Sequence, residues 1–359
     1  MTARIRTDLE QIPGYVAGRS IPGSIKLASN EVAAGPLPSV REVLANAGAL
    51  INRYPDTGAV ALTQRIAQRF GVDTKNIALG CGSVALCQQL VQVSSTAQDE
   101  VVFPWRSFEA YPIMTRVVGA QARPVPLTEG HALDLDAMLA AITDKTRLVF
   151  VCTPNNPTGT AIAEQDLRRF IDAVPRDVLV VIDEAYREFV DDANVPDGIA
   201  TTTQAWARGH GNVAVLRTFS KAYGLAGLRV GYCVAPEPVT EALRKVFVPF
   251  SVNSLAQIAA IASLDAEDEL MQRCKAIVGE RYRVREELLG MGYEVPPTQA
   301  NFVWLPLEER TSAFNEHCME HKVIVRVFVT GQGGDGARVT IGEPSENDAF
   351  LEAARTFPR

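Results

Sequence analysis

The sequence predicts an α/β protein built around a mainly parallel sheet sandwiched by helices, with a smaller α+β unit towards the C-terminus. Strand-length runs of apolar, often β-branched residues recur between residues 100 and 234, and they are continuously apolar, as in strands covered on both faces. Helical patterns separate these runs, and strands that alternate with helices form parallel, right-handed units. Active sites in such sheets gather beyond the carboxyl ends of the strands.

The expected elements follow in chain order. Strands of the main sheet are expected at 100–103, 148–151, 178–182, 213–216 and 230–234, and helices at 85–93, 135–142, 164–173 and 202–207. After about Pro249 a long helical stretch is expected over 255–289, and it is broken by two glycines at 290 and 292. Strands are then expected at 301–305, 323–327 and 338–341. A last helix is expected to start near Ser345, with Asp348 placed for a capping box.

Length and composition limit the class of protein. A chain of 359 residues is long enough for a large core and two lobes, and 47% hydrophobic with 21% charged residues is ordinary for a globular protein. We expect a cytoplasmic protein without a membrane segment, because no apolar run approaches ~20 residues and the N-terminus lacks the apolar core of a signal peptide. The formal net charge of -7 argues against a nucleic-acid partner.

Neither the cysteines nor the histidines indicate a metal. The six cysteines are scattered without a CxxC pair and are expected to be reduced thiols. His317 and His321 lie four apart on an expected helix, but no third ligand is near them in the sequence, so we expect no metal. The glycine-rich residues 330–336 lack the GK[ST] ending of a nucleotide-binding loop, and we interpret them as a turn.

Residues 217–231, RTFSKAYGLAGLRVG, carry the strongest chemical pattern of the chain. They place Lys221 at the mouth of an expected buried strand, with Thr218, Ser220 and Arg229 as donors for a phosphate. A lysine considered alone is usually a solvated surface charge. A lysine among phosphate donors is what a pyridoxal phosphate Schiff-base site needs. The segment resembles the cofactor-lysine motif of fold-type I aminotransferases, in particular the histidinol-phosphate and aromatic aminotransferase group.

The acid at the end of the strand expected at 178–182 fits the same resemblance. Asp183 begins the run DEAY, and an acid after a strand is by itself most often a helix cap. Beside Lys221, the resemblance implies that Asp183 keeps the pyridine nitrogen of the cofactor protonated, so that the ring acts as an electron sink. It also implies that Tyr186 hydrogen-bonds the ring hydroxyl.

Two loops complete the implied cofactor site. The run CTPNNPTG at 152–159 could be a plain tight loop, but the resemblance implies that its Asn156 donates to the ring oxygen. The glycine turn at 80–84 precedes an expected helix, whose N-terminus favours an anion. Such turns are common; in the family, Gly82, Ser83 and Val84 would wrap the cofactor phosphate together with the donors of the lysine segment.

An aromatic side chain is expected on the face of the pyridine ring. Phe108 falls where the family stacks an aromatic residue, which in many members is a tyrosine. Trp105 is the rival, and a plain core position is an alternative for both.

The resemblance also implies substrate-binding residues and a second subunit. Arg338 would clamp the substrate carboxylate, since a guanidinium offers a bidentate fork. Arg326 could bind a substrate phosphate. Tyr15 and Asn30 would belong to an N-terminal arm that covers the substrate. Tyr54, in the run NRYPD, would reach the cofactor phosphate of the neighbouring subunit, which implies a homodimer with shared sites.

The resemblance runs from about Tyr15 to the last helix, with six motifs in family order. It implies an arm and part of a small domain at 1–45, a large pyridoxal phosphate-binding domain at 46–249, and a linking helix with the C-terminal small domain at 250–359. It also implies ping-pong transamination, in which Lys221 is displaced by the amino acid and then removes and returns the α-proton.

The substrate is less sharply indicated. Residues 26–31, 80–84, 104–111 and 247–254 resemble the actinobacterial aromatic aminotransferase branch, which favours transfer between aromatic amino acids and 2-oxoglutarate. The alternative is a histidinol-phosphate aminotransferase. A cofactor-binding protein without transaminase activity is disfavoured, because the catalytic set is complete and no DNA-binding segment is attached.

Overall fold

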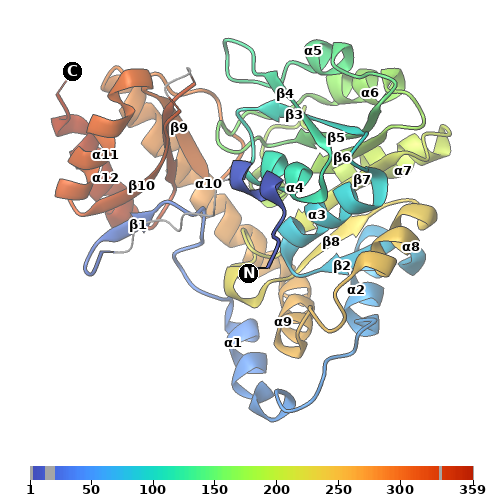
Figure 1. Cartoon of the computed structure of the whole chain (residues 1–359). Helices are drawn as coiled ribbons and strands as arrows, with labels where there is room; N and C mark the ends of the chain where they lie inside the picture. Colours follow the sequence, from blue (N-terminus) through green and yellow to red (C-terminus); the bar gives the residue numbers. More distant parts are fainter. Residues whose placement is uncertain (1–2, 13–20, 331–333, 359) are drawn as a thin grey trace.

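The protein has two lobes, each built on its own sheet (Figure 1). The computed structural model describes residues 3–12, 21–330 and 334–358. The larger lobe holds a seven-stranded sheet of order β2-β8-β7-β6-β5-β3-β4, in which β8 is antiparallel to both neighbours and the other paired strands are parallel. The smaller lobe holds a sheet of order β1-β10-β11-β9. The predicted α/β class with a smaller α+β unit is confirmed.

The strands have the following bounds. The large sheet contains β2 (Ile77–Gly80), β3 (Glu100–Trp105), β4 (Gln121–Pro126), β5 (Thr146–Cys152), β6 (Leu179–Asp183), β7 (Val213–Thr218) and β8 (Gly231–Val234). The small sheet contains β1 (Ile25–Leu27), β9 (Phe302–Pro306), β10 (Val323–Phe328) and β11 (Gly336–Thr340). The five strands expected in the large sheet are present, and β1, β2 and β4 are additions that the sequence did not reveal.

The helices have the following bounds. They are α1 (Pro38–Ala45), α2 (Val60–Phe70), α3 (Gly82–Ser94), α4 (Ala110–Val118), α5 (Leu135–Ala140), α6 (Glu164–Ala173), α7 (Gly198–Ala207), α8 (Glu237–Val246), α9 (Ser254–Asp265), α10 (Glu267–Gly290), α11 (Thr311–Glu320) and α12 (Pro344–Thr356). Six short 3-10 turns complete the described residues: η1 (Thr7–Gln11), η2 (Ala47–Leu50), η3 (Thr74–Asn76), η4 (Arg187–Phe189), η5 (Ala226–Leu228) and η6 (Glu308–Arg310).

The large sheet is covered by helices on both faces, which explains its continuously apolar strands. Successive residues of a strand point to opposite faces. In β5, Leu148 and Phe150 pack into a core formed with α3, α4 and α8, whereas Val149 and Val151 pack into a second core with α2, α6 and α9. All four side chains are fully buried.

Two helix predictions are wrong in detail. The stretch expected as one helix over 255–289 forms two helices, α9 and α10, separated at Ala266. The last helix begins at Pro344, and its capping box joins Glu343 with Glu346. Asp348 lies further along the helix and forms an ion pair with Arg283 at 2.9 Å. Proline is favoured in the first helical turn, because its missing N–H would have no partner there.

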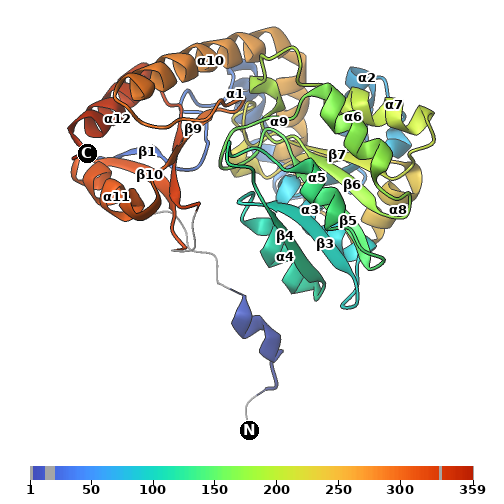
Figure 2. The same ribbon diagram turned by 90° about the horizontal axis from the view of Figure 1, so that it is seen from above.

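Helix α10 joins the lobes, running from the large lobe along the small one (Figure 2). Arg281 in this helix is fully buried, and it donates to the carbonyls of Phe189 at 2.9 Å and Ala300 at 3.3 Å. Its guanidinium also pairs with Asp191 at 2.6 Å. The N-terminal segment adds a second connection, since β1 pairs in parallel with β10 of the small lobe and α1 packs against α9. Within the described ranges, none of the helices is long and apolar enough to cross a membrane.

We predict that Gly336→Ala destabilises the protein by about 1–3 kcal/mol, the usual cost of overpacking a filled core. A Cβ at Gly336 would overlap the carbonyl oxygen of Leu305 and lie 2.5 Å from a ring carbon of Trp304. Gly279→Ala is the control, because that site inside α10 is open and alanine favours a helix by about 1 kcal/mol. Urea unfolding measures both variants. Equal stability of Gly336→Ala and the parent protein would contradict this packing.

Candidate active site

Three neighbouring parallel strands, β5, β6 and β7, end at one edge of the large sheet. Cys152, Asp183 and Leu216 are paired in register across these ends. The loop that carries Asn156 follows β5, and the turn that carries Lys221 follows β7. The motifs singled out in the sequence therefore converge at the edge where such sheets place their sites.

Asp183 is a buried carboxylate with one oxygen fixed and the other available. It is 4% exposed, and its Oδ2 accepts a hydrogen bond of 2.6 Å from the hydroxyl of Tyr111. Its Oδ1 has no hydrogen-bond partner within the part of the chain that the structure describes. Burial raises the pKa of Asp183 to about 6, and the bond from Tyr111 opposes this rise. The carboxylate thus stays largely ionised at neutral pH, with Oδ1 ready to meet a donor.

Tyr111 contacts the candidate site, and the sequence assigned it no role. It lies in α4, fully buried, with its ring stacked on Phe150 at a centroid distance of 4.4 Å. A buried tyrosine hydroxyl usually has a hydrogen-bond partner. That rule predicts that Tyr111, if buried, has a hydrogen-bond partner. It does not identify Asp183 as that partner, because the two residues lie 72 positions apart in the chain.

Lys221 is held as an amine that loses its proton near neutrality. Its Nζ donates to the carbonyl of Ser29 at 2.9 Å and lies 5.9 Å from the ring centroid of Tyr186. Burial, and next the positive charge of Arg338, lower the pKa of Lys221 to about 7. A neutral amine is the nucleophilic form of lysine, so the site prepares this side chain for attack on a carbonyl.

Arg338 brings the two lobes together at the site. It lies on β11 of the small lobe, and its guanidinium donates to Asn156 Oδ1 at 2.5 Å and to the carbonyl of Ala28 at 2.6 Å. The rings of Phe302 and Phe328 lie 5.5 and 5.7 Å from the same guanidinium. The predicted residues Arg338 and Asn156 are thus in contact, with apolar surface around the cation.

Asn30 is fully buried and links the N-terminal segment to the site. Its Nδ2 donates to the hydroxyl of Tyr186 at 2.8 Å. Its backbone has a positive φ of 54° and is held by Thr340 Oγ1 at 2.9 Å and Asn301 Nδ2 at 3.2 Å. Burial raises the pKa of Tyr186 to about 12, so its hydroxyl keeps its proton. The sequence missed Thr340 and Asn301.

The predicted phosphate donors meet beside the first turn of α3. Thr218 Oγ1 and Ser220 Oγ are 3.0 Å apart, and the Arg229 guanidinium lies 3.3 Å from Ser220 Oγ. Gly82 opens α3 with a φ of 77°, and a Cβ there would overlap the Arg229 guanidinium. Glycine at 82 therefore lets the cation approach the helix N-terminus, where free N–H groups favour an anion.

The other two residues predicted for this phosphate group lie in the same turn of α3. A Cβ at Gly231 would lie 2.6 Å from the backbone nitrogen of Ser83, so β8 and α3 approach closely here. Val84 follows in the helix and is 38% exposed.

The two aromatic candidates differ in their contacts. Phe108 packs edge-on against Tyr111, at a centroid distance of 5.5 Å, and is thereby one contact from Asp183. Trp105 instead packs edge-on against Phe103 and lies under the guanidinium of Arg106. This arrangement favours Phe108 as the stacking ring.

The remaining predicted residues lie at the margin of the site or outside the described residues. Arg326 on β10 is in register with Arg338 and forms an ion pair with Glu109 at 2.8 Å. Tyr54 is 82% exposed and stacks on Phe250 at 4.5 Å. Tyr15 falls outside the residues that the structure describes.

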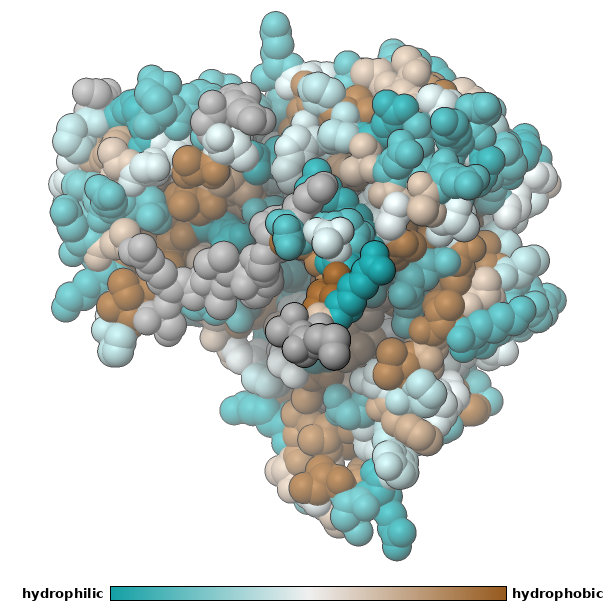
Figure 3. Space-filling model, viewed as in Figure 1, coloured by the Kyte–Doolittle hydropathy of each residue, from teal (hydrophilic) through white to brown (hydrophobic). Residues whose placement is uncertain are grey.

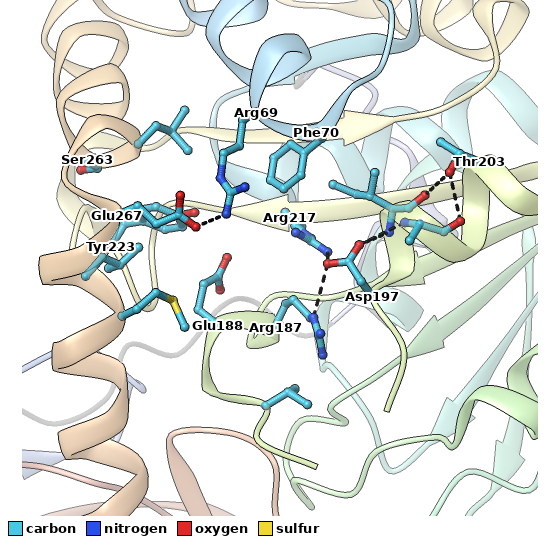
Figure 4. A pocket seen from close by; sticks show the side chains of 16 residues that line it. Arg69, Phe70, Arg187, Glu188, Asp197, Thr203, Arg217, Tyr223, Ser263 and Glu267 are labelled. Carbon is cyan, nitrogen blue, oxygen red and sulfur yellow. Dashed lines mark hydrogen bonds and ion pairs between the residues drawn. The ribbon is translucent and has the colours of Figure 1, made fainter. Parts of the chain in front are cut away.

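Two cavities lie near these elements. One of about 580 Å³ is lined by residues of both lobes, including Ser220, Thr340 and Glu31, and so borders the lysine segment. The other, of about 500 Å³, is lined by no predicted site residue (Figure 4). Its guanidiniums are already engaged: Arg217 with Asp197 at 2.7 Å, and Arg69 with Glu267. Of the predicted site residues, Ser220 lines the first cavity, whereas Lys221, Asp183 and Arg338 line neither of the two.

The side chains of the described residues do not indicate a metal site. Among the described residues, no group of three or more histidine, cysteine, aspartate or glutamate side chains is placed to hold a metal. The rings of His317 and His321 lie 4.4 Å apart, and each histidine has a nitrogen within 3.3 Å of Thr356 Oγ1. All six cysteines are free thiols.

Known proteins are similar to this chain along nearly its whole length. Residues 22–353 match the family described as aminotransferase class I and II. An aromatic amino acid aminotransferase of Rhodococcus jostii is 58% identical over 99% of this chain and 96% of its own length, and one of Mycolicibacterium smegmatis is 54% identical over 99% and 96%. The crystal structure of a histidinol-phosphate aminotransferase from Sinorhizobium meliloti with pyridoxal-5'-phosphate has a TM-score of 0.90, at 26% identity, over 99% of this chain and 97% of that one.

We predict that Tyr111→Phe raises the pKa of Asp183 above its value of about 6. The lost hydrogen bond stabilises the ionised carboxylate, and bonds to charged groups contribute about 1.5–3 kcal/mol. Carbon-13 NMR of aspartate-labelled, cofactor-free protein follows the titration. Tyr293→Phe is the control, because that hydroxyl donates to the carbonyl of Ala354 in the small lobe. An unmoved Asp183 titration in Tyr111→Phe would refute the coupling.

We predict that Lys221 in the cofactor-free protein becomes reactive towards reductive methylation as the pH rises through about 7. Its lowered pKa means that the neutral amine is present above this pH, whereas an ordinary lysine needs a pH near 10. Lys75 is the internal control, because pairing with Glu237 raises its pKa. Peptide mapping at a series of pH values gives both curves. If Lys221 and Lys75 had the same dependence of methylation on pH, then burial would not lower the pKa of Lys221.

Proposed function

The chain belongs to the class I and II aminotransferase family, whose fold-type I members depend on pyridoxal 5'-phosphate, and on that premise we propose that it transfers amino groups between aromatic amino acids and 2-oxoglutarate. The observation that carries the proposal is the 58% identity, over 99% of the chain, to a relative named aromatic amino acid aminotransferase. The histidinol-phosphate aminotransferase with the similar fold is 26% identical.

The described residues fit the cofactor. Asp183 Oδ1 is a buried acceptor that lacks a partner among the described residues, as a site for a pyridinium N–H requires. Thr218, Ser220 and Arg229 meet at the N-terminus of α3 and suit a phosphate. Lys221 offers an amine with a pKa of about 7 for a Schiff base. Pyridoxal 5'-phosphate, when bound, supplies a ring that takes up the electrons of the substrate α-carbon.

The roles of the surrounding residues follow from their charges and contacts. Asp183, largely ionised at neutral pH, would hold a proton at the pyridine nitrogen. Tyr186, which keeps its hydroxyl proton, and Asn156 would face the ring oxygen. Lys221, a buried amine with a pKa of about 7 in this structure, would hold the cofactor and would serve as the base that takes the substrate α-proton and returns it. Phe108 would pack on the ring face.

Arg338 is proposed to bind the substrate α-carboxylate. A guanidinium binds a carboxylate in bidentate fashion. The rings of Phe302 and Phe328 beside it offer apolar surface for an aromatic side chain. Asn30, which is held beside Tyr186, is proposed to lie near the substrate carboxylate.

A histidinol-phosphate aminotransferase is the second candidate, because an enzyme of that name has a similar fold. Arg326 is in register with Arg338 on the neighbouring strand and could bind a substrate phosphate, but it does not decide between the two candidates. Histidinol phosphate has no carboxylate, and its phosphate would need these cations instead.

We predict that phenylalanine or tyrosine gives a higher kcat/KM than histidinol phosphate, with 2-oxoglutarate as the acceptor. The reason is the match of Arg338 and its aromatic neighbours to an α-carboxylate with an apolar side chain. Steady-state kinetics over a donor panel measures the ratio. A higher kcat/KM for histidinol phosphate would instead support the histidinol-phosphate aminotransferase.

A homodimer with shared sites is also proposed. Figure 3 shows brown, hydrophobic surface on the projection that carries α1 and η2. The exposed large apolar side chains include Leu50, Ile51, Tyr54, Val60, Val248 and Phe250. Exposed apolar patches of this kind usually mark a protein–protein interface. A partner subunit would cover them, and Tyr54 could then serve the partner's cofactor phosphate.

We predict that Lys221→Ala and Tyr54→Phe subunits, each of low activity alone, recover activity when mixed. One site of the heterodimer then carries both lesions and the other carries neither. Activity of refolded mixtures, compared with each parent, is the measurement. If heterodimers form, as shown by a tag on one subunit, and activity does not exceed that of the parents, then Tyr54 does not act across the interface.

A further inference from the structure

An ion pair crosses from one lobe to the other at the margin of the proposed substrate site. Glu109 directly follows the proposed stacking residue Phe108 and stands at the start of α4. Its Oε2 lies 2.8 Å from a guanidinium nitrogen of Arg326, which belongs to β10 of the small lobe. Glu109, from the large lobe, therefore forms an ion pair with Arg326, the cation that a substrate phosphate would need.

The surroundings of this pair are rich in positive charge. Arg326 and Arg338 are register partners on β10 and β11, and both guanidiniums lie 5.7 Å from the ring centroid of Phe328. Arg106 lies 5.5 Å from the same ring and pairs with Asp335 at 3.7 Å. Three guanidiniums thus surround one aromatic ring, and Glu109 offsets the charge of Arg326.

We propose that Glu109 sets donor specificity: by pairing with Arg326 it withholds this guanidinium from phosphate-bearing donors and thereby favours donors with an uncharged aromatic side chain. The proposal rests on the function proposed above, and it concerns the second anion position of the same site. Glu109 acts through Arg326 and is a positioning residue rather than a catalytic one.

The physical argument is a difference between two substrates. A phosphate monoester carries a charge of about −1.5 to −2 at neutral pH. To use Arg326 it must displace Glu109 or lie beside a carboxylate of like charge, which is a repulsive element of the kind that specific sites use. An aromatic side chain carries no charge and meets neither obstacle. The side chains of Glu109 and Arg326 are 43% and 28% exposed, so the pair itself adds little to stability, and its effect lies in selection.

The test compares Glu109→Gln, Glu109→Asp and the parent holoenzyme. Single-turnover reactions with phenylalanine and with histidinol phosphate, each followed by the cofactor spectrum, need no acceptor. In Glu109→Gln, the ratio of the histidinol phosphate to the phenylalanine rate constant should rise about fivefold, the scale of one partly exposed charge pair. Glu109→Asp keeps the charge and should stay near the parent ratio. A ratio that falls or stays constant in Glu109→Gln overturns the proposal.

A second comparison isolates the role of Arg326. In an Arg326→Gln background, Glu109→Gln should no longer change the ratio, and a persistent change would show that Glu109 does not act through this cation. Inorganic phosphate provides a readout independent of turnover with histidinol phosphate. It should inhibit the phenylalanine half-reaction more strongly in Glu109→Gln than in the parent enzyme, and equal inhibition counts against the proposal.

These results separate the two proposals. Failure of aromatic donors in the parent enzyme would refute the proposed function. In that case the histidinol phosphate rate constant by itself would still decide the role of Glu109: it should rise in Glu109→Gln and stay near the parent value in Glu109→Asp, and an unchanged value in Glu109→Gln would overturn the proposal.

Discussion

Burial of ionisable groups is the constraint on which the site depends. It disfavours the charged form of every group, so it raises the pKa of a carboxyl and lowers that of an amine. Asp183 moves up to about 6 and Lys221 down to about 7, so two values that ordinarily lie far apart come together around neutrality. The bond from Tyr111 limits the first shift, and the charge of Arg338 adds to the second. The fold thereby sets the protonation states that transamination uses.

The site exists only where the two lobes meet. Arg338 comes from the small sheet and binds Asn156 in a loop of the large lobe, while Asn30 connects Tyr186 to Thr340. Lys221 itself is held by a carbonyl of the N-terminal segment. A relative shift of the lobes would therefore change the surroundings of Lys221 and of Arg338 together.

Sequence could predict this site wherever a chemical pattern is local. Residues 217–231 contain the lysine and three phosphate donors, and Asp183 ends an apolar strand; their resemblance to the motifs of a known family gave both of them a predicted role. The partners of these residues could not be found in the same way. Tyr111, Glu109 and Ser29 act across 72, 217 and 192 positions of the chain, and only the packing of the lobes selects them.

The secondary structure, too, was predicted only in part from local sequence patterns. Buried central strands were predicted from their apolar runs, but β4 escaped because it lies at the edge of the sheet, is largely exposed and contains two prolines. The break at Ala266 between α9 and α10 escaped because no glycine or proline marks it.

The charged side chains around the second cavity can be explained by the alternation of side chains along a strand. Side chains alternate along β6 and β7, so when Asp183 and Thr218 point towards the site, their neighbours Glu184 and Arg217 point to the opposite face. There the Arg217 guanidinium contacts Glu184 Oε2 at 3.0 and 2.8 Å, and both residues are buried. A buried ion pair adds little net stability, but loss of one partner leaves an uncompensated charge. The pair therefore links the ends of β6 and β7, beside the residues that carry Asp183 and the lysine turn.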